Sequence, residues 1–343
     1  MQPISSKRRG GVTQKDVAKR AGVSQAAVSA VFRGDTRKIG VSDNTRERIL
    51  RAVKELNYRP NISARAMRSQ RTFNLGFFTL AQGPLYHEPV EFRDGLYTAA
   101  SERDYHIVLI RMSHSEAGGP DSLPSIFRQA HLDAMVIGNA RFIPSEVAQA
   151  VNESNLPIVY LNEKAEHNAV YCDEVEATRQ LMQQLFEKGL ERIHFVRLHP
   201  NYTHHSAVER EGTYQACMRE QGLEPHSHLL PYRDPGSGLL QAMRTNPAPD
   251  AILAYNEHTL VLTERAFMQA GISTESLQFA TFDYGLFGQY IARPFLTSGV
   301  PRFEMGQAAA RMAIDLATDD ASAPAPSVIV QASLREVPGV QLP

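Results

Sequence analysis

Apolar residues recur at two different spacings along this chain of 343 residues. Before residue 58 they lie three or four positions apart, which is typical of short amphipathic helices. These residues are Val17, Ala18, Ala21, Val28, Val31, Ile49, Val53 and Leu56. From Phe73 onward, short apolar runs such as 75–80 and 107–110 alternate with helical patterns. Alternation of this kind predicts parallel β-sheets covered by helices.

The alternation occurs as two successive sets, and the second set begins near Tyr171. We predict strands at 75–80, 107–110, 134–138, 158–161, 193–196, 251–254 and 279–282. We predict helices at 92–103, 123–129, 144–153, 174–188, 206–221 and 258–270. Gly189, Gly222 and Gly271 directly follow the last three helices, as glycine commonly does. The sequence therefore predicts an α/β body with two similar lobes.

The first two helical patterns meet at a glycine. Thr13 can cap the first helix, and Gly22 permits the left-handed conformation of a sharp reversal. Ser24 can cap the second helix, whose Val28 and Val31 would point back at Ala18. This order predicts a helix-turn-helix, with an ordinary helical hairpin as the alternative. The outer face of its second helix is predicted to be free of carboxylates and able to lie in a DNA groove; its residues are Ser24, Gln25, Ala26, Ser29 and Ala30.

A third helix can begin at Ser42, and Pro60 then breaks the chain before a short helical segment that Asn61 can cap. The whole order resembles the DNA-binding head of the lactose-repressor (LacI/GalR) family of bacterial transcription regulators. The matching residues are Val17-Ala18, Ala21-Gly22-Val23-Ser24, Val28-Ser29, Val41-Ser42, Thr45-Arg46, Leu56-Asn57-Tyr58, Pro60-Asn61 and Ala64-Arg65. Because this motif is long and ordered, the resemblance is specific.

Charge divides the chain in the same way. Residues 1–72 contain 17 lysines and arginines against 5 aspartates and glutamates, a net charge of +12, whereas the whole chain has −1. The remainder therefore carries −13. A basic head on an acidic body predicts a module that binds a polyanion, joined to one that does not.

Composition excludes other classes of protein. No run approaches the ~20 apolar residues of a membrane span, and residues 1–12 lack the apolar core of a secretory signal. The two cysteines, Cys172 and Cys217, suggest neither a disulfide framework nor a zinc site. We expect a cytoplasmic protein that does not associate with a membrane.

The resemblance implies an all-α helix-turn-helix head and an α/β two-lobed body similar to periplasmic binding proteins, with parallel sheets and helices on both faces. We expect a disordered basic arm at 1–12, the head at 13–58, a hinge helix or linker at 59–72, and an effector-binding and dimerisation domain at 73–343. The N-lobe would comprise about 73–170 and 298–326, and the C-lobe about 171–297 and 327–340. The chain would cross between the lobes near Tyr171, Ser298 and Ser327.

The resemblance also implies residues at DNA. They are Thr13, Ser24, Gln25, Ala26, Ser29, Arg33, Arg37, Thr45, Tyr58, Asn61, Ala64 and Met67. The family often has arginine or histidine where this chain has Ala30, which removes one expected base contact. Met67 stands where the family typically has leucine as a minor-groove wedge, and it can still intercalate.

Candidate effector residues follow predicted strands, where ligands bind in open α/β sheets. They are Tyr86, Asp173, Arg210, Asn256 and Asp283. Arg210 and Asp283 match the family's ligand-facing arginine and aspartate, and such side chains offer several hydrogen bonds to a polyol. In the alternative, Arg210 forms a surface salt bridge with Glu209 or its neighbours, Asp283 caps a turn, Asp173 caps a helix, and Tyr86 lies in an exposed loop.

The chain lacks the glycine-rich phosphate loop, the dinucleotide fingerprint and the nucleophile elbow of common enzymes. The histidines at 199, 204, 205, 226 and 228 are interpreted as loop residues rather than metal ligands. We therefore expect no catalysis, no cofactor and no metal. The expected function is that of a homodimeric transcriptional regulator, more specifically a repressor, which binds palindromic double-stranded operator DNA and responds to a sugar or sugar derivative. A purine effector, a partner protein and a sugar-transport role are the alternatives.

Overall fold

The computed structural model describes residues 12–33, 40–58, 71–81, 89–113, 131–138, 149, 153, 156–198, 204–231, 239–240, 248–285, 288–318 and 324–338. The chain divides into two compact units, residues 1–72 and residues 73–343. We call the first the head and the second the body, and describe each by itself.

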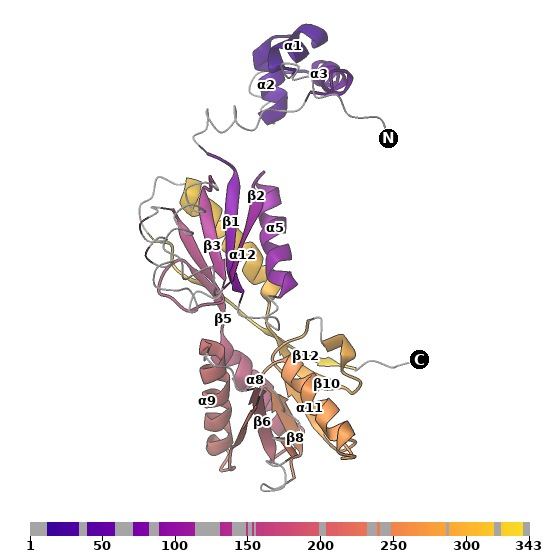
Figure 1. Ribbon diagram of the computed structural model, residues 1–343, viewed down its shortest axis with the longest axis vertical. Helices are drawn as coiled ribbons and strands as arrows, with labels where there is room; N and C mark the ends of the chain where they lie inside the picture. The colour runs from indigo at the N-terminus through magenta and orange to yellow at the C-terminus, as the bar shows by residue number, and fades with distance from the viewer. Residues whose placement is uncertain are drawn as a thin grey trace. The chain divides into compact units, whose positions relative to one another are not determined.

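The head contains three helices: α1 (Gln14–Ala21), α2 (Gln25–Arg33) and α3 (Asp43–Glu55) (Figure 1). Thr13 and Asp16 cap each other's backbone at the start of α1, and Gly22 ends this helix with a φ of 63°. The Ser24 hydroxyl accepts a hydrogen bond from the Ala27 N–H at 3.2 Å, as an N-cap does. The predicted helix-turn-helix is present.

The three helices pack on one small apolar core. Its buried members are Val17, Ala18, Ala21, Val28, Ile49, Ala52 and Tyr58. Arg48 of α3 closes the turn by donating to the carbonyl oxygens of Ala21 at 2.6 Å and Gly22 at 3.0 Å. These two carbonyls lie at the end of α1 and would otherwise need water.

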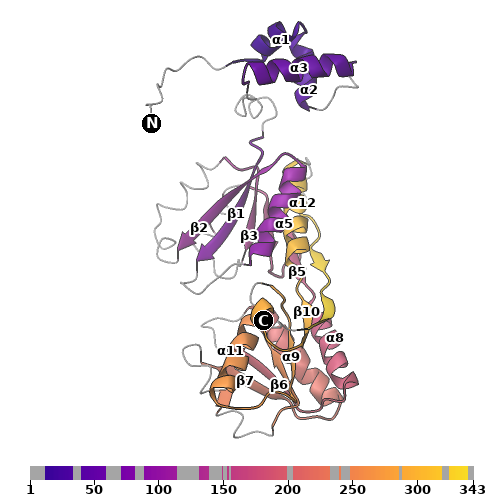
Figure 2. The ribbon, with the colours of Figure 1, turned by 90° about the vertical axis from the view of Figure 1, so that its right-hand side faces the viewer.

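The body contains two six-stranded sheets, each from a separate lobe (Figures 1 and 2). The first sheet has the order β11-β5-β4-β3-β1-β2, and the second has the order β12-β10-β9-β8-β6-β7. The strands of the first are β1 (Asn74–Ala81), β2 (His106–Ser113), β3 (Ala134–Gly138), β4 (Ile158–Leu161), β5 (Ala169–Cys172) and β11 (Val328–Val330). Those of the second are β6 (Ile193–Leu198), β7 (His226–Leu230), β8 (Ala251–Ala254), β9 (Gln278–Thr281), β10 (Phe295–Gly299) and β12 (Ser333–Val337).

The strands pair in parallel in both sheets, except that β12 runs antiparallel to β10. The α/β two-lobed prediction is thus confirmed, with this one antiparallel edge added. The third crossing between lobes lies later than we expected near Ser327. β11 pairs with β5 in the first sheet, so the chain crosses only between β11 and β12.

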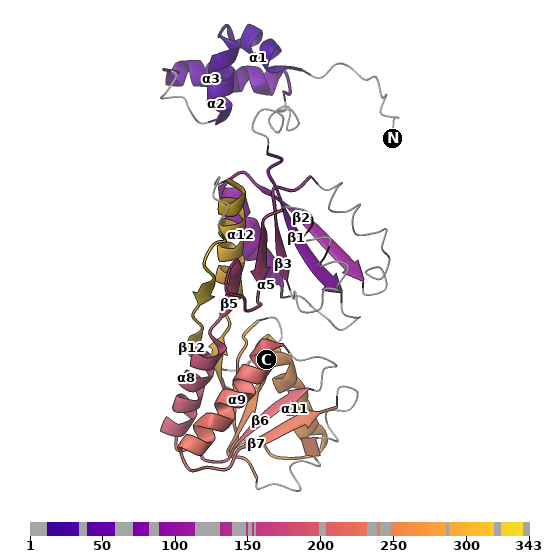
Figure 3. The same ribbon diagram turned by 90° about the vertical axis from the view of Figure 1, so that its left-hand side faces the viewer.

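The helices of the body are α5 (Val90–Glu102), α8 (Glu174–Glu187), α9 (His205–Glu220), α11 (Glu257–Gln269) and α12 (Arg302–Thr318), with a 3₁₀ turn at η2 (Gly288–Tyr290). In the second lobe, α8 and α9 contribute to the core on one face of the sheet and α11 to the core on the other (Figure 3). In the first lobe, α5 and α12 lie side by side over one face (Figure 2).

Helices α5 and α12 approach each other at the backbone. A Cβ atom at Gly95 would lie 2.0 Å from the Phe303 carbonyl oxygen, and one at Gly306 would lie 2.2 Å from the Phe92 carbonyl oxygen. Both positions therefore require glycine. Since α12 follows the second crossing, this contact returns the chain to the first lobe.

Most predicted strands and helices are found within one to three residues of their predicted bounds. The helix predicted at 123–129 lies outside the described residues, and of the helix predicted at 144–153 only residues 149 and 153 are described, both as helical. The sequence interpretation missed several elements, namely β5, β7, β10, β11, β12 and α12.

Candidate DNA-binding face and strand-end site

The exposed face of α2 is formed by small and amide side chains. Ser24, Gln25 and Ala26 are exposed, and Ser29 is half-buried. Helix α2 has no acidic residue, so no carboxylate of its own opposes a phosphate. Such a face can enter a major groove, with Gln25 as its longest hydrogen-bonding side chain.

Two head residues are not where we expected them. Ala30 was assigned to the groove-facing side of α2, but it is fully buried. Tyr58, predicted to lie at DNA, is only 7% exposed and packs on Phe32 with ring centroids 5.6 Å apart. Its ring therefore serves the core of the head, where it joins α2 to the end of α3.

Other predicted DNA contacts have local roles or cannot be placed. Thr13 is exposed and engaged in the cap of α1, and Thr45 is half-buried and hydrogen-bonded to Ser42 at 3.0 Å. The side chain of Arg33 and the residues Arg37, Asn61, Ala64 and Met67 lie outside the described residues. The same holds for most of the hinge and for the basic arm up to residue 11.

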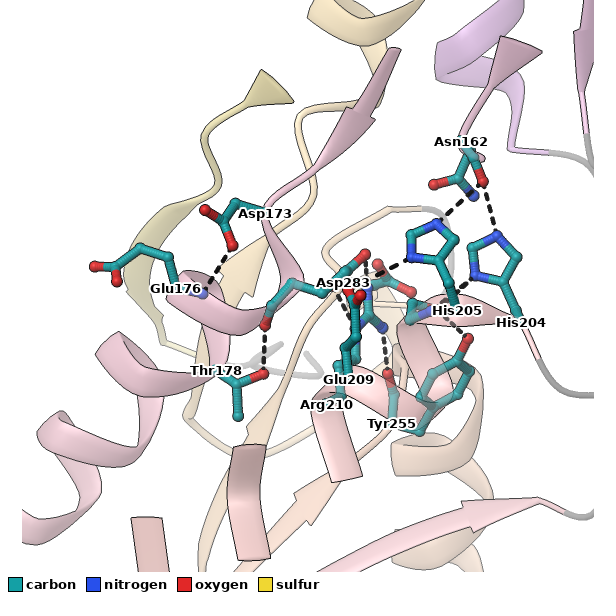
Figure 4. Close-up of polar contacts among 12 residues, drawn as sticks. Asn162, Asp173, Glu176, Thr178, His204, His205, Glu209, Arg210, Tyr255 and Asp283 are labelled. Carbon is teal, nitrogen blue, oxygen red and sulfur yellow. Dashed lines mark hydrogen bonds and ion pairs between the residues drawn. The ribbon is translucent and has the colours of Figure 1, made fainter. Parts of the chain in front are cut away.

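In the body, polar side chains gather just beyond the ends of β5, β8 and β9 and on the neighbouring helix α9 (Figure 4). We call these residues the strand-end site; they are Asp173, Glu174, Arg210, Tyr255, Asn256, Glu257 and Asp283. The structure brings Arg210 and Asp283 together here with Tyr255, as Figure 4 shows. Tyr86, the remaining effector candidate, lies outside the described residues.

Arg210 is buried at the centre of this site and is paired with a carboxylate. Its Nε and Nη2 donate to the Glu174 carboxylate at 2.7 and 3.0 Å, and its Nη1 donates to the Tyr255 carbonyl oxygen at 2.7 Å. The guanidinium also lies over the rings of Tyr255 and Phe282. Burial alone would lower the pKa of Arg210, but the carboxylates of Glu174 and Asp283 raise it above its usual range. The alternative of a surface salt bridge with Glu209 is wrong; the partner is Glu174.

Asp283 is also buried and paired. It is 6% exposed, and its Oδ2 accepts from Arg302 Nη2 at 2.9 Å. Its Oδ1 is buried without a hydrogen-bond partner in the described part of the chain. A buried carboxylate oxygen in this state is a ready acceptor for a ligand hydroxyl.

Three further side chains of the strand-end site hold backbone groups. Asp173 caps α8 by accepting from the Glu176 N–H at 3.0 Å, and Asn256 caps α11 by accepting from the Thr259 N–H at 2.8 Å. Glu257, which the sequence interpretation did not assign, accepts from the N–H groups of Gly285 and Gly288, both at 2.7 Å. These caps hold the strand ends in place around Arg210.

A chain of hydrogen bonds connects the strand-end site to the first lobe (Figure 4). His204 Nε2 contacts the Asn162 carbonyl oxygen at 2.8 Å, its Nδ1 contacts Ser206 Oγ at 2.7 Å, and Ser206 Oγ contacts Tyr255 Oη at 2.7 Å. Because a carbonyl oxygen only accepts, Nε2 carries the proton of His204, and Ser206 donates to Nδ1. Burial, and then the neighbouring His205, lowers the pKa of His204 to about 4.

A second group of histidines lies on β6 and β7, which are neighbouring strands of the second sheet. His194 and His228 are buried on β6 and β7, with His228 Nε2 and His194 Nδ1 3.0 Å apart. His226 and His228 are therefore strand residues, whereas we interpreted them as loop residues; His199 is not described. Burial lowers the pKa of His194 to about 3, with a further contribution from His228. Among the described residues, no group of histidines, cysteines or carboxylates could hold a metal ion.

Comparison with known protein families assigns both units. Residues 13–61 match the model of bacterial regulatory proteins of the lacI family, and residues 182–336 match a periplasmic binding protein-like domain. The chain belongs to the lacI family of bacterial regulatory proteins. As a member of this family it is a DNA-binding transcriptional regulator, and the helix-turn-helix head is its DNA-binding part.

The lacI-family regulator is 26% identical over 307 residues to the HTH-type transcriptional regulator AscG of Escherichia coli (strain K12), covering 86% of this chain and 89% of AscG. It is 26% identical to catabolite control protein A of Staphylococcus xylosus, covering 88% and 91% of the two chains. These relatives are regulators.

Solved structures share the fold. The regulator CelR in complex with cellobiose has a TM-score of 0.66 and 24% identity, covering 94% of this chain and 98% of CelR. A lac repressor dimer bound to operator and the anti-inducer ONPF has a TM-score of 0.69 and 20% identity, covering 94% of this chain and 97% of the lac repressor chain.

None of the helices in the described part of the regulator has the length and apolar character that a membrane span needs.

Proposed function

We propose that this regulator binds a palindromic operator as a homodimer, most simply as a repressor, and that a sugar or sugar derivative at the strand-end site controls its DNA affinity. The observation that carries the proposal is that two different sites occur on one chain. The head exposes an acid-free recognition face, and the body places Arg210 and Asp283 beside the ends of parallel strands. Parallel α/β sheets bind ligands at such ends.

The chemistry of the strand-end site supports a polyol. Arg210 has N–H groups beyond those used in its three hydrogen bonds, and Asp283 Oδ1 offers an acceptor. Hydroxyl groups pair with both donors and acceptors, and a site with buried polar groups discriminates strongly against ligands that leave them unpaired. The cellobiose complex of CelR, a protein of the same fold, is consistent with a sugar.

Control would arise because ligand binding and DNA binding share one conformational equilibrium. A ligand that favours one arrangement of the lobes would change the spacing of the two heads in a dimer. The hydrogen bonds from Tyr255 through Ser206 and His204 to Asn162 span the lobes, so they would respond to such a change. We propose that the protein acts in the cytoplasm by binding alone, without catalysis.

The hinge would be the link to DNA. Its predicted helix at 61–68 is too short to be stable alone in water, so it would form only when paired on DNA, with Met67 inserted between base steps. Replacing Met67 by glycine should leave dimerisation unchanged, weaken operator binding and remove the DNA bend seen in circular-permutation gel shifts. Full bending by Met67→Gly would rule out the wedge.

The function is tested by selecting bound sequences from genomic fragments and then measuring operator affinity with sugars, sugar derivatives and purines. We expect a palindromic site and a change of affinity with one neutral sugar. Selection of no sequence would contradict the operator proposal. A response to a purine alone, or only to an added protein, would replace the sugar by that effector class.

A further inference from the structure

The positive charge at the centre of the strand-end site is already compensated. Glu174 is 1% exposed and Arg210 is 4% exposed, and two parallel hydrogen bonds of 2.7 and 3.0 Å join them. This is the bidentate geometry by which an arginine binds a carboxylate or a phosphate ligand. Glu174 thus occupies, from within the chain, the place that an anionic ligand would take on this guanidinium.

The other charges around the site are predominantly negative. Arg302 is paired with Asp283, and Asp173 and Glu257 add two further carboxylates. These two arginines and four carboxylates, all among the described residues, carry a formal net charge of −2. His204 is linked to Tyr255 by hydrogen bonds through the Ser206 hydroxyl. It adds no positive charge near neutral pH because burial lowers its pKa to about 4.

An anion would meet a high cost in these surroundings. Removing a phosphate or carboxylate from water requires a cation that is free to pair with it. Arg210 could offer an uncompensated positive charge only if Glu174 were displaced, which would leave the buried Glu174 carboxylate without its partner. A hydroxyl group carries no such cost, and it can accept from the guanidinium and donate to Asp283 Oδ1.

We infer that the strand-end site takes an uncharged, hydroxyl-rich ligand and that Glu174 determines this specificity by neutralising Arg210. The inference rests on the proposed function and narrows it, because it excludes sugar phosphates and sugar acids as effectors. Glu174 is a specificity residue that acts through Arg210.

The test replaces Glu174 by glutamine in the full-length protein. Glutamine keeps the size and one acceptor oxygen but leaves the charge of Arg210 uncompensated. The matched control is Glu176→Gln on the same helix, since Glu176 is exposed and its carboxylate accepts a hydrogen bond from the Gln180 side chain rather than from an arginine. The probe is inorganic phosphate at constant ionic strength, and saturable stabilisation against heat is the measure.

We expect phosphate to stabilise the unaltered protein and Glu176→Gln equally and only weakly. This weak stabilisation would come from phosphate bound to the basic head, which all variants share. Glu174→Gln should gain a phosphate site at least about tenfold tighter, the factor that one charge-assisted hydrogen bond supplies. The double variant Glu174→Gln/Arg210→Gln should lose the gained site. Glucose should bind the unaltered protein no more weakly than glucose 6-phosphate or glucuronate.

Two results would overturn the inference. One is a Glu174→Gln protein that folds but gains no phosphate site. The other is an unaltered protein that binds phosphate or glucose 6-phosphate more tightly than the double variant does, and this result decides even if Glu174→Gln does not fold. Failure of every sugar to change operator affinity would instead contradict the proposed sugar effector, and the phosphate comparison would still stand.

Discussion

Arg20 and Glu55 in the head form an ion pair whose side chains are 58% and 39% exposed, whereas Arg210 and Glu174 in the body are 4% and 1% exposed. The two regions thus use the same residue types in opposite ways. Arg20 of the head remains in water, where it can exchange Glu55 for a phosphate at little cost. In the strand-end site of the body, the charges of Arg210, Glu174 and Asp283 are buried and fixed in ion pairs, where the loss of a partner is costly. Exposed charges of this kind suit contacts to DNA phosphates, whereas buried and paired charges suit a ligand that satisfies fixed hydrogen-bonding groups.

The largest effect should come from salt acting on the head. With a net charge of +12 in residues 1–72, several phosphate contacts are expected. Operator affinity should then fall by about three orders of magnitude or more between ~50 and ~200 mM salt, because each contact releases counterions. Binding of a neutral effector to the body should hardly change over the same range. Salt-independent DNA binding, measured by fluorescence anisotropy, would remove the contrast.

A second comparison uses one arginine from each region. Arg302→Ala leaves Asp283 buried without its partner, so the free energy of unfolding of the body should drop by about 3–5 kcal/mol. Arg20→Ala breaks an exposed pair and should cost the head at most about 1 kcal/mol. Urea denaturation of both variants measures the two losses, and equal losses would show that burial does not distinguish the pairs.

A smaller effect concerns base recognition within the head. Gln25 is exposed on α2, and its amide can pair with adenine in the major groove. Gln25→Ala should cost roughly 1–3 kcal/mol at one symmetric pair of operator positions and relax the base preference there. Sequence selection with the variant checks this. An unchanged selected site would mean that Gln25 does not read a base.

The smallest effect, counted for each buried histidine, should be that of pH on the stability of the body. The head, residues 1–72, contains no histidine, whereas the pKa values of His194 and His204 in the body are lowered to about 3 and about 4, chiefly by burial. These two side chains take up protons near pH 6.5 in the unfolded chain but not in the folded body, so the stability of the body falls as pH drops below about 6.5. The loss should be about 1 kcal/mol per histidine on going to about pH 5.5.

Denaturation monitored separately for the two regions between about pH 5 and 7 tests this. His194→Gln should flatten the pH dependence of the body, whereas exposed His167→Gln is the control and should not. A body whose stability is constant over this range would show that folding does not lower the pKa values of the buried histidines.

The sequence predicted most where the signals are local. Thr13, Gly22 and Ser24 lie within a few residues of the backbone groups that they cap or turn, so their pattern fixes the helix-turn-helix. Continuous apolar runs likewise predicted the central strands β3, β4 and β8 residue for residue. The edge strand β12 was missed because exposed and buried positions mix along its short and partly polar sequence.

The sequence by itself determined the helical head, the two α/β lobes and the basic and acidic halves, since capping, periodicity and charge depend on neighbours along the chain. Tertiary structure decided which side chains pair. Glu174 and Arg210 are 36 residues apart, and His228 lies 34 residues from His194. It also decided that Ala30 and Tyr58 are buried, and Tyr58 packs on Phe32 of α2 in the core of the head. No periodicity in one helix reports such contacts; they arise only where the folded chain brings distant strand and helix ends together.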